Sequence, residues 1–198
     1  MPGVSAILTA AGESTRMGSP KALLSWQGAT LIEYQIRCLI ESGVAEVVVV
    51  LGHRADEISP YVSGDRVRHV HNPDYRRGKA TSVKCGVRAI DRDADAILLL
   101  AVDQPRNTDV ISRVIRAHVE NNPVITSPRF QGHGGHPLVF SATLKAELEN
   151  ISEENQGIRE VFERHRDGVR ELEIDDPILR LDLNTPEDYE EAKALYGA

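Results

Sequence analysis

A stretch near the start of the chain combines the residue types that bind anions. It reads I-L-T-A-A-G-E-S-T-R-M-G-S-P-K from Ile7 to Lys21, and an apolar run leads into it. Gly12 and Gly18 permit sharp turns and let backbone N–H groups come close to a ligand. Arg16 and Lys21 would add two full positive charges to the same place. The pattern predicts a buried strand that feeds an anion-binding loop.

Two well-known phosphate-binding motifs also follow a strand, and neither fits. The P-loop requires glycine followed by Lys-Ser/Thr, whereas Gly18 is followed by Ser19-Pro20-Lys21. The dinucleotide fingerprint is G-x-G-x-x-G, whereas Gly12 is followed by Glu13 and Ser14. A plain glycine-rich turn with solvated basic residues is the alternative interpretation, and the ordered coincidence of features argues against it.

The remainder of the chain must position this loop. Apolar strands alternate with helices in the first part of the chain. The strands are predicted at 4–8, 46–51, 67–71 and 96–102, and the helices at 30–42, 55–62, 80–90 and 108–120. Repeated β-α-β units predict a three-layer, Rossmann-like α/β fold with a mostly parallel sheet. Beyond residue 122 the pattern changes, and a small antiparallel addition is predicted. Its short strands are expected at 123–127, 136–140, 169–174 and 179–182, and its helices at 142–148, 156–166 and after Thr185-Pro186.

The fourth predicted strand, I-L-L-L-A-V, ends at an acidic residue, Asp103. If the sheet order begins 3-2-1-4, the first and fourth strands end side by side where the winding reverses, which is where open parallel sheets bind ligands. Asp103 would then face the glycine loop across one crevice. Its alternative role is to cap the turn at Gln104-Pro105.

These motifs resemble those of the molybdenum cofactor nucleotidyltransferases, the MobA-like NTP transferases, and the cytidylyltransferase branch is the most similar. The resemblance implies a nucleotidyltransferase fold and covers nearly the whole chain. It also implies that Asp103, in D-Q-P, binds the Mg²⁺ carried by the nucleotide, with Mn²⁺ as the alternative ion. The segment R-L-D-L-N-T-P-E-D would supply a second ligand, for which Asp182 is favoured over Asn184.

The implied reaction transfers CMP from CTP to the phosphate of molybdopterin and releases pyrophosphate. A phosphate monoester is already ionised near neutral pH, so positioning and charge neutralisation suffice without a general base. The resemblance implies catalytic roles for Lys21, Arg16 and Asp103. It implies substrate-binding roles for Ala10, Ala11, Gly12, Glu13, Ser14, Asn72, Gly78, Thr81, Ser82 and His136.

The preferences for base and acceptor also depend on the resemblance. The loop reads T-A-A-G at 9–12 where the guanylyltransferase branch has L-A-G-G, so small side chains that close the pocket favour CTP over GTP. Residues 78–82 match an element usually read G-M-x-S-S, but Lys79 replaces methionine. Lys79 is either a cation for a different phosphate or a solvated lysine. Zinc is not expected at His133 and His136, because no third ligand accompanies them.

Composition limits the class of protein. The 198 residues, 41% of them hydrophobic, can bury one core, so residues 1–198 are predicted to form a single domain. The net charge of -7, without a basic cluster, argues against nucleic acid as a partner. No apolar run is long enough to span a bilayer and no secretory signal is visible, so no membrane partner and a cytoplasmic location are expected.

Two other functions stay open. One is a cytidylyl- or uridylyltransferase that acts on a sugar or polyol phosphate, because its first loop would be very similar. The other is a non-catalytic nucleotide- or cofactor-binding chaperone with a molybdoenzyme as its partner. The second function predicts ligand binding without release of pyrophosphate.

Overall fold

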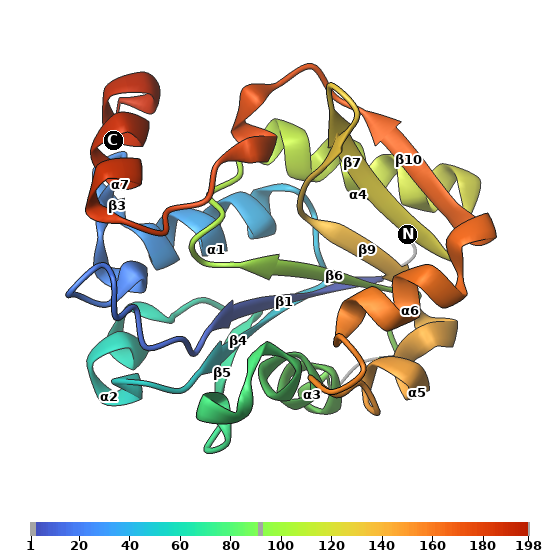
Figure 1. Ribbon diagram of the computed structural model, residues 1–198, viewed down its shortest axis with the longest axis horizontal. Coiled ribbons are helices and arrows are strands. Elements are labelled where there is room, and N and C mark those ends of the chain that lie inside the picture. The colour runs from blue at the N-terminus through green and yellow to red at the C-terminus, as the bar shows by residue number, and fades with distance from the viewer. Residues whose placement is uncertain (1–2, 91–92, 198) are drawn as a thin grey trace.

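A mostly parallel sheet crosses the molecule from edge to edge (Figure 1). The computed structural model describes residues 3–90 and 93–197. Within these ranges, the sheet has eight strands in the order β10-β7-β9-β6-β1-β4-β5, and β8 pairs with β7. The strands are β1 (Val4–Ala10), β4 (Glu46–Leu51), β5 (Val67–His71), β6 (Ala96–Ala101), β7 (Ile125–Phe130), β8 (His133–Gly134), β9 (Leu138–Ser141) and β10 (Val169–Glu173).

The order predicted for the first four strands, 3-2-1-4, is confirmed, because β5, β4, β1 and β6 are neighbours in that order. Thr9 on β1 lies opposite Val50 on β4 and Ala101 on β6, and both pairings are parallel. The order beyond β6 departs from simple parallel winding. Strand β9 pairs antiparallel with β6 and with β7, whereas β10 runs parallel to β7. The antiparallel addition predicted for the second half is therefore part of the main sheet.

Helices cover both faces of the sheet, which explains why its central strands are apolar at successive positions. Leu8, Val49 and Leu100 pack with α1 and α4, whereas Ile7 and Val48 pack on the opposite face with α3 and α5 (Figure 1). The helices are α1 (Leu31–Glu41), α2 (Ala55–Ile58), α3 (Lys79–Ala89), α4 (Thr108–Asn121), α5 (Lys145–Leu148), α6 (Ile158–Arg164) and α7 (Pro186–Tyr196). In the described part of the chain, none of the helices has both the length and the apolar character needed to cross a membrane.

The predicted helix starts at two threonines are confirmed. Thr30 and Thr185 each accept a hydrogen bond from the third residue of their helix, whose carboxylate in turn accepts the threonine N–H. Two predicted helices, at 55–62 and 142–148, are partly formed by short 3₁₀ turns. The 3₁₀ turns lie at Lys21–Leu23, Ser59–Tyr61, Tyr75–Arg77, Ala142–Leu144, Arg166–Gly168 and Pro177–Arg180.

The strand predicted at 179–182 is wrong. The Asp176 carboxylate accepts the N–H of Ile178, and Pro177 provides a first-turn backbone angle, so the chain coils there instead of extending. A small hairpin was also not predicted. Strands β2 (Ser25–Trp26) and β3 (Ala29–Thr30) pair around Gln27 and Gly28, which both have positive φ.

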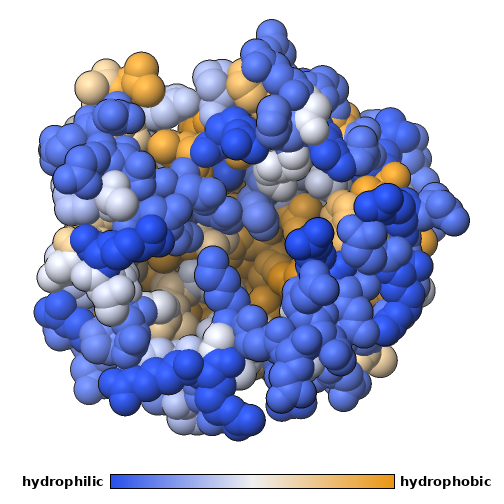
Figure 2. All heavy atoms as spheres, in the orientation of Figure 1, coloured by the Kyte–Doolittle hydropathy of each residue, from blue (hydrophilic) through white to orange (hydrophobic). Residues whose placement is uncertain are grey.

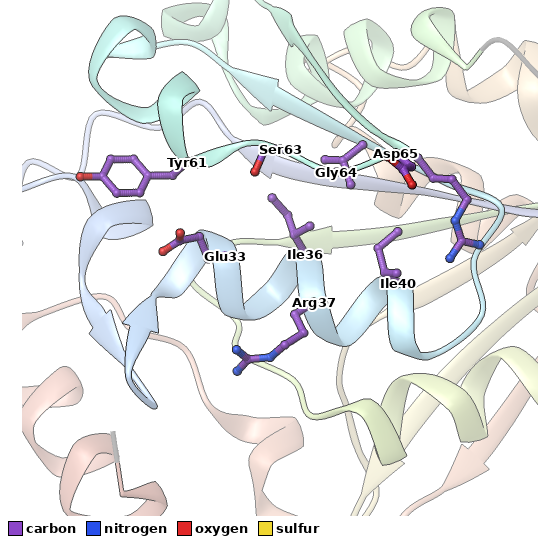
Figure 3. A pocket seen from close by; sticks show the side chains of 10 residues that line it. Glu33, Ile36, Arg37, Ile40, Tyr61, Ser63, Gly64 and Asp65 are labelled. Atoms are coloured by element: carbon purple, nitrogen blue, oxygen red, sulfur yellow. The ribbon is translucent and has the colours of Figure 1, made fainter.

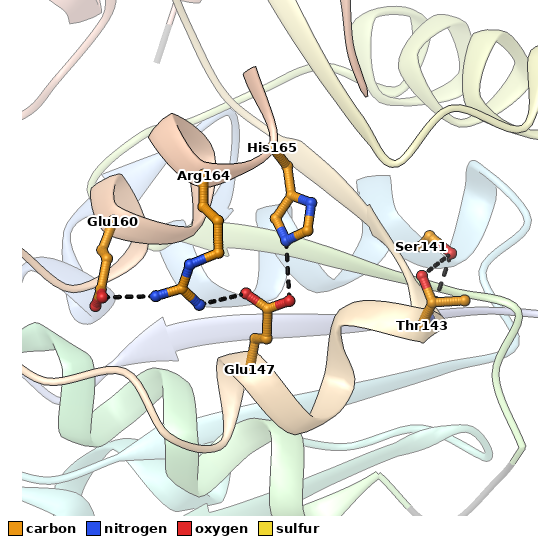
Figure 4. A network of polar contacts seen from close by, with 6 residues as sticks. All are labelled: Ser141, Thr143, Glu147, Glu160, Arg164 and His165. Carbon is orange, nitrogen blue, oxygen red and sulfur yellow. Dashed lines mark hydrogen bonds and ion pairs between the residues drawn. The ribbon is translucent and has the colours of Figure 1, made fainter. Parts of the chain in front are cut away.

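A polar network fixes α6 against α5 (Figure 4). The Glu147 carboxylate accepts a hydrogen bond of 2.8 Å from Arg164 Nη1 and lies 2.9 Å from His165 Nε2. Arg164 also donates to Glu160 at 2.7 Å. Partial burial opposes ionisation of Glu147, but the hydrogen bonds from His165 and Arg164 outweigh it, so the pKa of Glu147 is lowered from its usual value of 4.5.

We expect Glu147→Gln to lower the free energy of unfolding by about 0.5–1 kcal/mol at pH 7, since these ion pairs are partly exposed. A carboxyl group whose pKa is lowered by folding stabilises the protein above its unfolded pKa and stops doing so as pH falls through its folded pKa. The difference from wild type should therefore shrink below pH 4.5. Urea unfolding of both proteins, at pH 7 and below pH 4.5, measures this difference in unfolding free energy, and Glu149→Gln is the matched control. A gap that stays constant at every pH would contradict the assignment.

Candidate active site

The loop after β1 is shaped by hydrogen bonds around Ser14. Its carbonyl accepts the N–H groups of Met17 and Gly18, and its hydroxyl accepts the N–H of Lys21 at 3.2 Å. Gly18 has a φ of 75°, as its predicted turn requires. Gly12 does not adopt a positive φ, whereas Ser14 does, with a φ of 53°. A β-carbon on Gly12 would meet nothing within 4 Å, so the space beside this part of the loop is open.

Lys21 joins this loop to two distant segments. Its ammonium group donates to Asp103 Oδ2 at 2.8 Å and to Asn184 Oδ1 at 3.1 Å. The side chains of Lys21 and Asp103 are 13% and 25% exposed, so their charges are largely shielded from bulk water. The Asp103 carboxylate is engaged by this lysine and not by the backbone of its own turn. The sheet order thus brings Lys21 and Asp103 together, as predicted.

The other predicted charged residues surround this contact. Arg16 and Asp182 both line the same cavity, and both are exposed. In residues 3–90 and 93–197, neither side chain has a hydrogen-bond partner or an ion-pair partner within contact distance. The N–H of Leu183 donates to the carbonyl of Asp103 at 2.8 Å, which holds the Asp182 segment beside the end of β6. A cation and a carboxylate are therefore available to a ligand.

These residues line a cavity of about 480 Å³ at the carboxyl ends of β1 and β6. Figure 2 shows a hollow over the central strands, in which an apolar floor is surrounded by hydrophilic residues. This volume is in the range of small-molecule sites, which combine apolar walls with a few convergent polar groups. Of the residues predicted to bind substrate, the cavity wall includes Ala10, Ala11, Gly12, Ser14, Gly78, Ser82 and His136.

Three residues predicted to bind substrate do not reach the cavity wall. The Asn72 amide donates to the hydroxyls of Thr81 and Ser82, at 2.9 and 3.0 Å, and its oxygen accepts the N–H of Asp74. Asn72 and Thr81 therefore brace the wall from behind, and Ser82 is the member of this group that lines it. Glu13 forms a 3.0 Å ion pair with Arg76 outside the cavity.

His136 reaches the cavity wall as a neutral side chain. Burial, aided by the positive charges of Arg106 and Lys79, lowers its pKa to about 4, although Asp103 opposes the shift. The imidazole can therefore give a hydrogen bond at neutral pH but no charge. His133, three residues earlier, is exposed and bonds the carbonyl of Gln131.

A buried arginine beside the site was not predicted. Arg106 is 1% exposed, and its guanidinium donates to backbone carbonyls of three chain segments, at Pro105, at His136 and at Leu179 and Leu181. Arginine is seldom buried, and its partners here are carbonyls, which every residue carries. The sequence therefore holds no signal for this contact beyond the position of Arg106 next to D-Q-P.

A second hollow, of about 390 Å³, lies between α1 and the segment that leads into β5. Figure 3 shows Glu33, Ile36 and Ile40 on the helix facing Tyr61 and its neighbours, whereas Arg37 extends away from them. Two of the charged side chains here are already used locally, and the hollow lacks the convergence of a lysine and carboxylates seen at β1 and β6. Glu33 completes the capping box with Thr30, and Arg66 donates to the carbonyl of Val44. The cavity at β1 and β6 is therefore the candidate active site.

The model of the MobA-like NTP transferase domain matches residues 6–169. The chain belongs to this family. The match includes the β1 loop and Asp103, whereas Asp182 and Asn184 lie beyond it. The MobA-like family and the three-layer fold agree with the resemblance inferred from the motifs, and the chain is a nucleotidyltransferase.

Relatives of this MobA-like chain extend over its whole length. It is 29% identical to the molybdenum cofactor cytidylyltransferase of Escherichia coli, over 99% of the chain and 98% of the relative. It is 31% identical to the nicotine blue oxidoreductase of Paenarthrobacter nicotinovorans, over 99% and 96%. These two relatives carry different names, so similarity alone identifies the family rather than the substrate.

Solved structures are similarly close. The crystal structure of Rv0371c from Mycobacterium tuberculosis matches the MobA-like chain with a TM-score of 0.84 and 27% identity, covering 100% of this chain and 98% of that one. A complex of Rv0371c with manganese matches with a TM-score of 0.79 and 25% identity, covering 96% and 97%.

One glycine of the MobA-like domain supports the β1 loop sterically. A β-carbon on Gly52 would lie 2.8 Å from Ala11 Cβ, from Ala11 O and from Tyr75 Cβ. We expect Gly52→Ala to displace the loop, to lower the free energy of unfolding by about 1–3 kcal/mol through overpacking, and to raise the KM for nucleotide. Thermal unfolding and steady-state kinetics measure the two effects. Gly134→Ala is the control, because its β-carbon would meet nothing within 4 Å. Equal effects of the two substitutions would refute this role.

Proposed function

We propose that this protein transfers CMP from CTP to the phosphate of a small acceptor, with molybdopterin favoured, and releases pyrophosphate. In this proposal, residues 1–198 act as one domain. The observation that carries the proposal is the bridge from the Lys21 ammonium to Asp103 and Asn184, beside an exposed arginine and a glycine loop. The similarity to molybdenum cofactor cytidylyltransferase over the full chain supports the choice of acceptor.

The oxygen donors at the site suit a hard divalent cation. Asp103 and Asp182 supply carboxylates, and Asn184 supplies an amide oxygen that already accepts a bond from a cationic group. The described residues contain no cluster of three or more histidine, cysteine or acidic side chains that could hold a metal ion. Mg²⁺ typically takes one or two carboxylates and completes its shell with water and substrate phosphates, so the donor set fits.

In the reaction, an oxygen of the acceptor phosphate attacks the α-phosphorus of CTP in line. The bond between the α-phosphorus and the bridging oxygen breaks, and pyrophosphate leaves with the electron pair. Lys21 and Arg16 would stabilise the negative charge that develops on the departing pyrophosphate. Asp103 and Asp182 would hold Mg²⁺ or Mn²⁺, which would neutralise charge on the reacting phosphates.

Several wall residues suit the other parts of the substrates. Ala10 and Ala11 are buried at the loop and present only methyl groups, which supports a closed pocket for a small pyrimidine base. Gly78, Lys79 and Ser82 line the wall at the start of α3, where the ribose or the acceptor would lie. His136, neutral at pH 7, would donate or accept a hydrogen bond to the acceptor.

The test is release of pyrophosphate from each of CTP, GTP and UTP, with Mg²⁺ or Mn²⁺ and a panel of acceptors. The panel contains molybdopterin, sugar phosphates and polyol phosphates. We expect the fastest release with CTP and molybdopterin. Release only with a sugar or polyol phosphate would support the alternative transferase. Binding of CTP without release in any combination would overturn the transferase proposal and favour a chaperone for a molybdoenzyme.

A further inference from the structure

The buried Arg106 guanidinium ties together the three segments that surround the candidate metal site. Its Nε donates to the carbonyl of His136 at 2.9 Å, and its Nη2 donates to that of Leu179 at 3.0 Å. Nη1 donates to the carbonyls of Pro105 and Leu181, at 2.9 and 3.0 Å. The partners lie as far as 75 residues away along the chain.

Three of these four carbonyls belong to a residue of the candidate site or to its direct neighbour, and Leu179 lies three residues before Asp182. Leu181 immediately precedes Asp182, and His136 is itself part of the wall. Pro105 follows Asp103 by two residues, and the N–H of Arg106 donates to the buried Gln35 side chain, which anchors this turn to α1. One planar group therefore fixes the backbone on three sides of the site.

The positive charge of Arg106 acts on the site from a distance. In the described chain, no carboxylate lies within ion-pair distance of the guanidinium. Burial lowers the pKa of Arg106 to about 10, and the negative charges of Asp182, Asp103 and Asp176 oppose this shift, so the group stays protonated at neutral pH. A buried cation that satisfies only carbonyls is costly compared with an apolar side chain of similar volume. Its field is directed at the two carboxylates that would share a metal ion, and it reduces their mutual repulsion.

We propose that Arg106 is a positioning residue that sets the spacing of Asp103 and Asp182 and thereby the affinity for the divalent cation. This inference rests on the proposed nucleotidyl transfer. Arg106 does not line the cavity, so it acts through the backbone that carries the ligands rather than by touching substrate. Residues that orient metal ligands from behind typically change metal affinity or activity by about 10- to 100-fold when replaced.

The experiment compares Arg106→Lys and Arg106→Met with wild type. Free Mn²⁺ is measured by electron paramagnetic resonance in the presence of a non-hydrolysable CTP analogue, and circular dichroism and thermal unfolding report the fold. We expect Mn²⁺ affinity to fall by about tenfold in Arg106→Lys and further in Arg106→Met. Since lysine keeps the charge, its kcat at saturating Mn²⁺ should stay within about threefold of wild type.

The matched control is Arg66→Met. Arg66 also donates to a backbone carbonyl, that of Val44 at 3.0 Å, but it lies at β4 and β5, away from the site. It should alter thermal stability without changing Mn²⁺ affinity. A folded Arg106→Lys variant with wild-type Mn²⁺ affinity would overturn the inference. So would failure of both Arg106 variants to fold, because Arg106 would then be required for the fold itself. Wild-type protein that binds Mn²⁺ but releases no pyrophosphate would instead overturn the proposed function, and the Mn²⁺ affinities would still judge Arg106.

Discussion

Lys21→Ala is expected to slow pyrophosphate release from CTP by about 100- to 1000-fold, the usual cost of losing one preorganised donor to a developing negative charge. The Lys21 side chain is 13% exposed, and its ammonium group lies 2.8 Å from Asp103 at the cavity wall, so it is in place before substrate binds. The KM for CTP should change less than kcat, because the interaction strengthens as pyrophosphate departs. Rapid-quench measurement of a single turnover separates the chemical step from product release.

Two further variants serve as comparisons for Lys21→Ala. Lys84→Ala, on α3 and outside the cavity wall, removes a lysine of the same chain without touching the site, and it should retain wild-type turnover. Lys21→Met keeps the apolar stem and loses only the charge, so it should be as slow as Lys21→Ala. Near-normal pyrophosphate release by Lys21→Met would show that the ammonium group has no catalytic role.

Asp103→Asn is expected to lower turnover by about 1000-fold, equivalent to the several kcal/mol that a bound divalent ion contributes to phosphoryl transfer. The substitution preserves shape and removes one negative charge, so the affinity for Mn²⁺ should fall as well. It also separates the two roles that the sequence allows for Asp103. Asparagine caps turns as well as aspartate does, so a purely turn-capping residue would tolerate the change.

The measurement for Asp103 is pyrophosphate release as a function of Mn²⁺ concentration, together with thermal unfolding. Asp109→Asn, on the exposed face of α4, is the control and should leave pyrophosphate release and its Mn²⁺ dependence unchanged, with a loss of at most about 0.5 kcal/mol in stability from its exposed ion pair with Arg113. If Asp103→Asn retains wild-type activity and metal dependence, the metal site must be built from other residues.

The part of the site that follows from sheet topology could be predicted from the sequence. The apolar strands β1, β4 and β6 have patterns long enough to identify, and their order places the ends of β1 and β6 side by side. This placement led to the prediction that Asp103 faces the glycine loop, and the structure adds that Lys21 at the end of this loop pairs with Asp103 directly. Threonine caps before α1 and α7 could also be predicted, because a capping box depends on residues only three positions apart.

The parts that depend on contacts between distant loops could not be predicted. The sequence around Leu179 alternates like a strand, but the Asp176 side chain and Pro177 turn it into a 3₁₀ coil. Asn72 and Thr81 match a substrate-binding motif, yet their polar groups satisfy each other behind the cavity wall. Arg106 binds carbonyls, which no pattern of side chains reveals.

The contact between Lys21 and Asp103 has a consequence for how the substrates enter. In the free protein these opposite charges neutralise each other. A lone divalent ion that binds Asp103 must therefore displace the Lys21 ammonium group, which then lacks a counterion. A lone triphosphate that draws Lys21 away strands the carboxylate in the same manner. When ion and triphosphate arrive as one complex, each replaces the partner that the other removes. Under the proposed function, the two binding events are therefore expected to be thermodynamically coupled, so that either component alone binds more weakly than the two together.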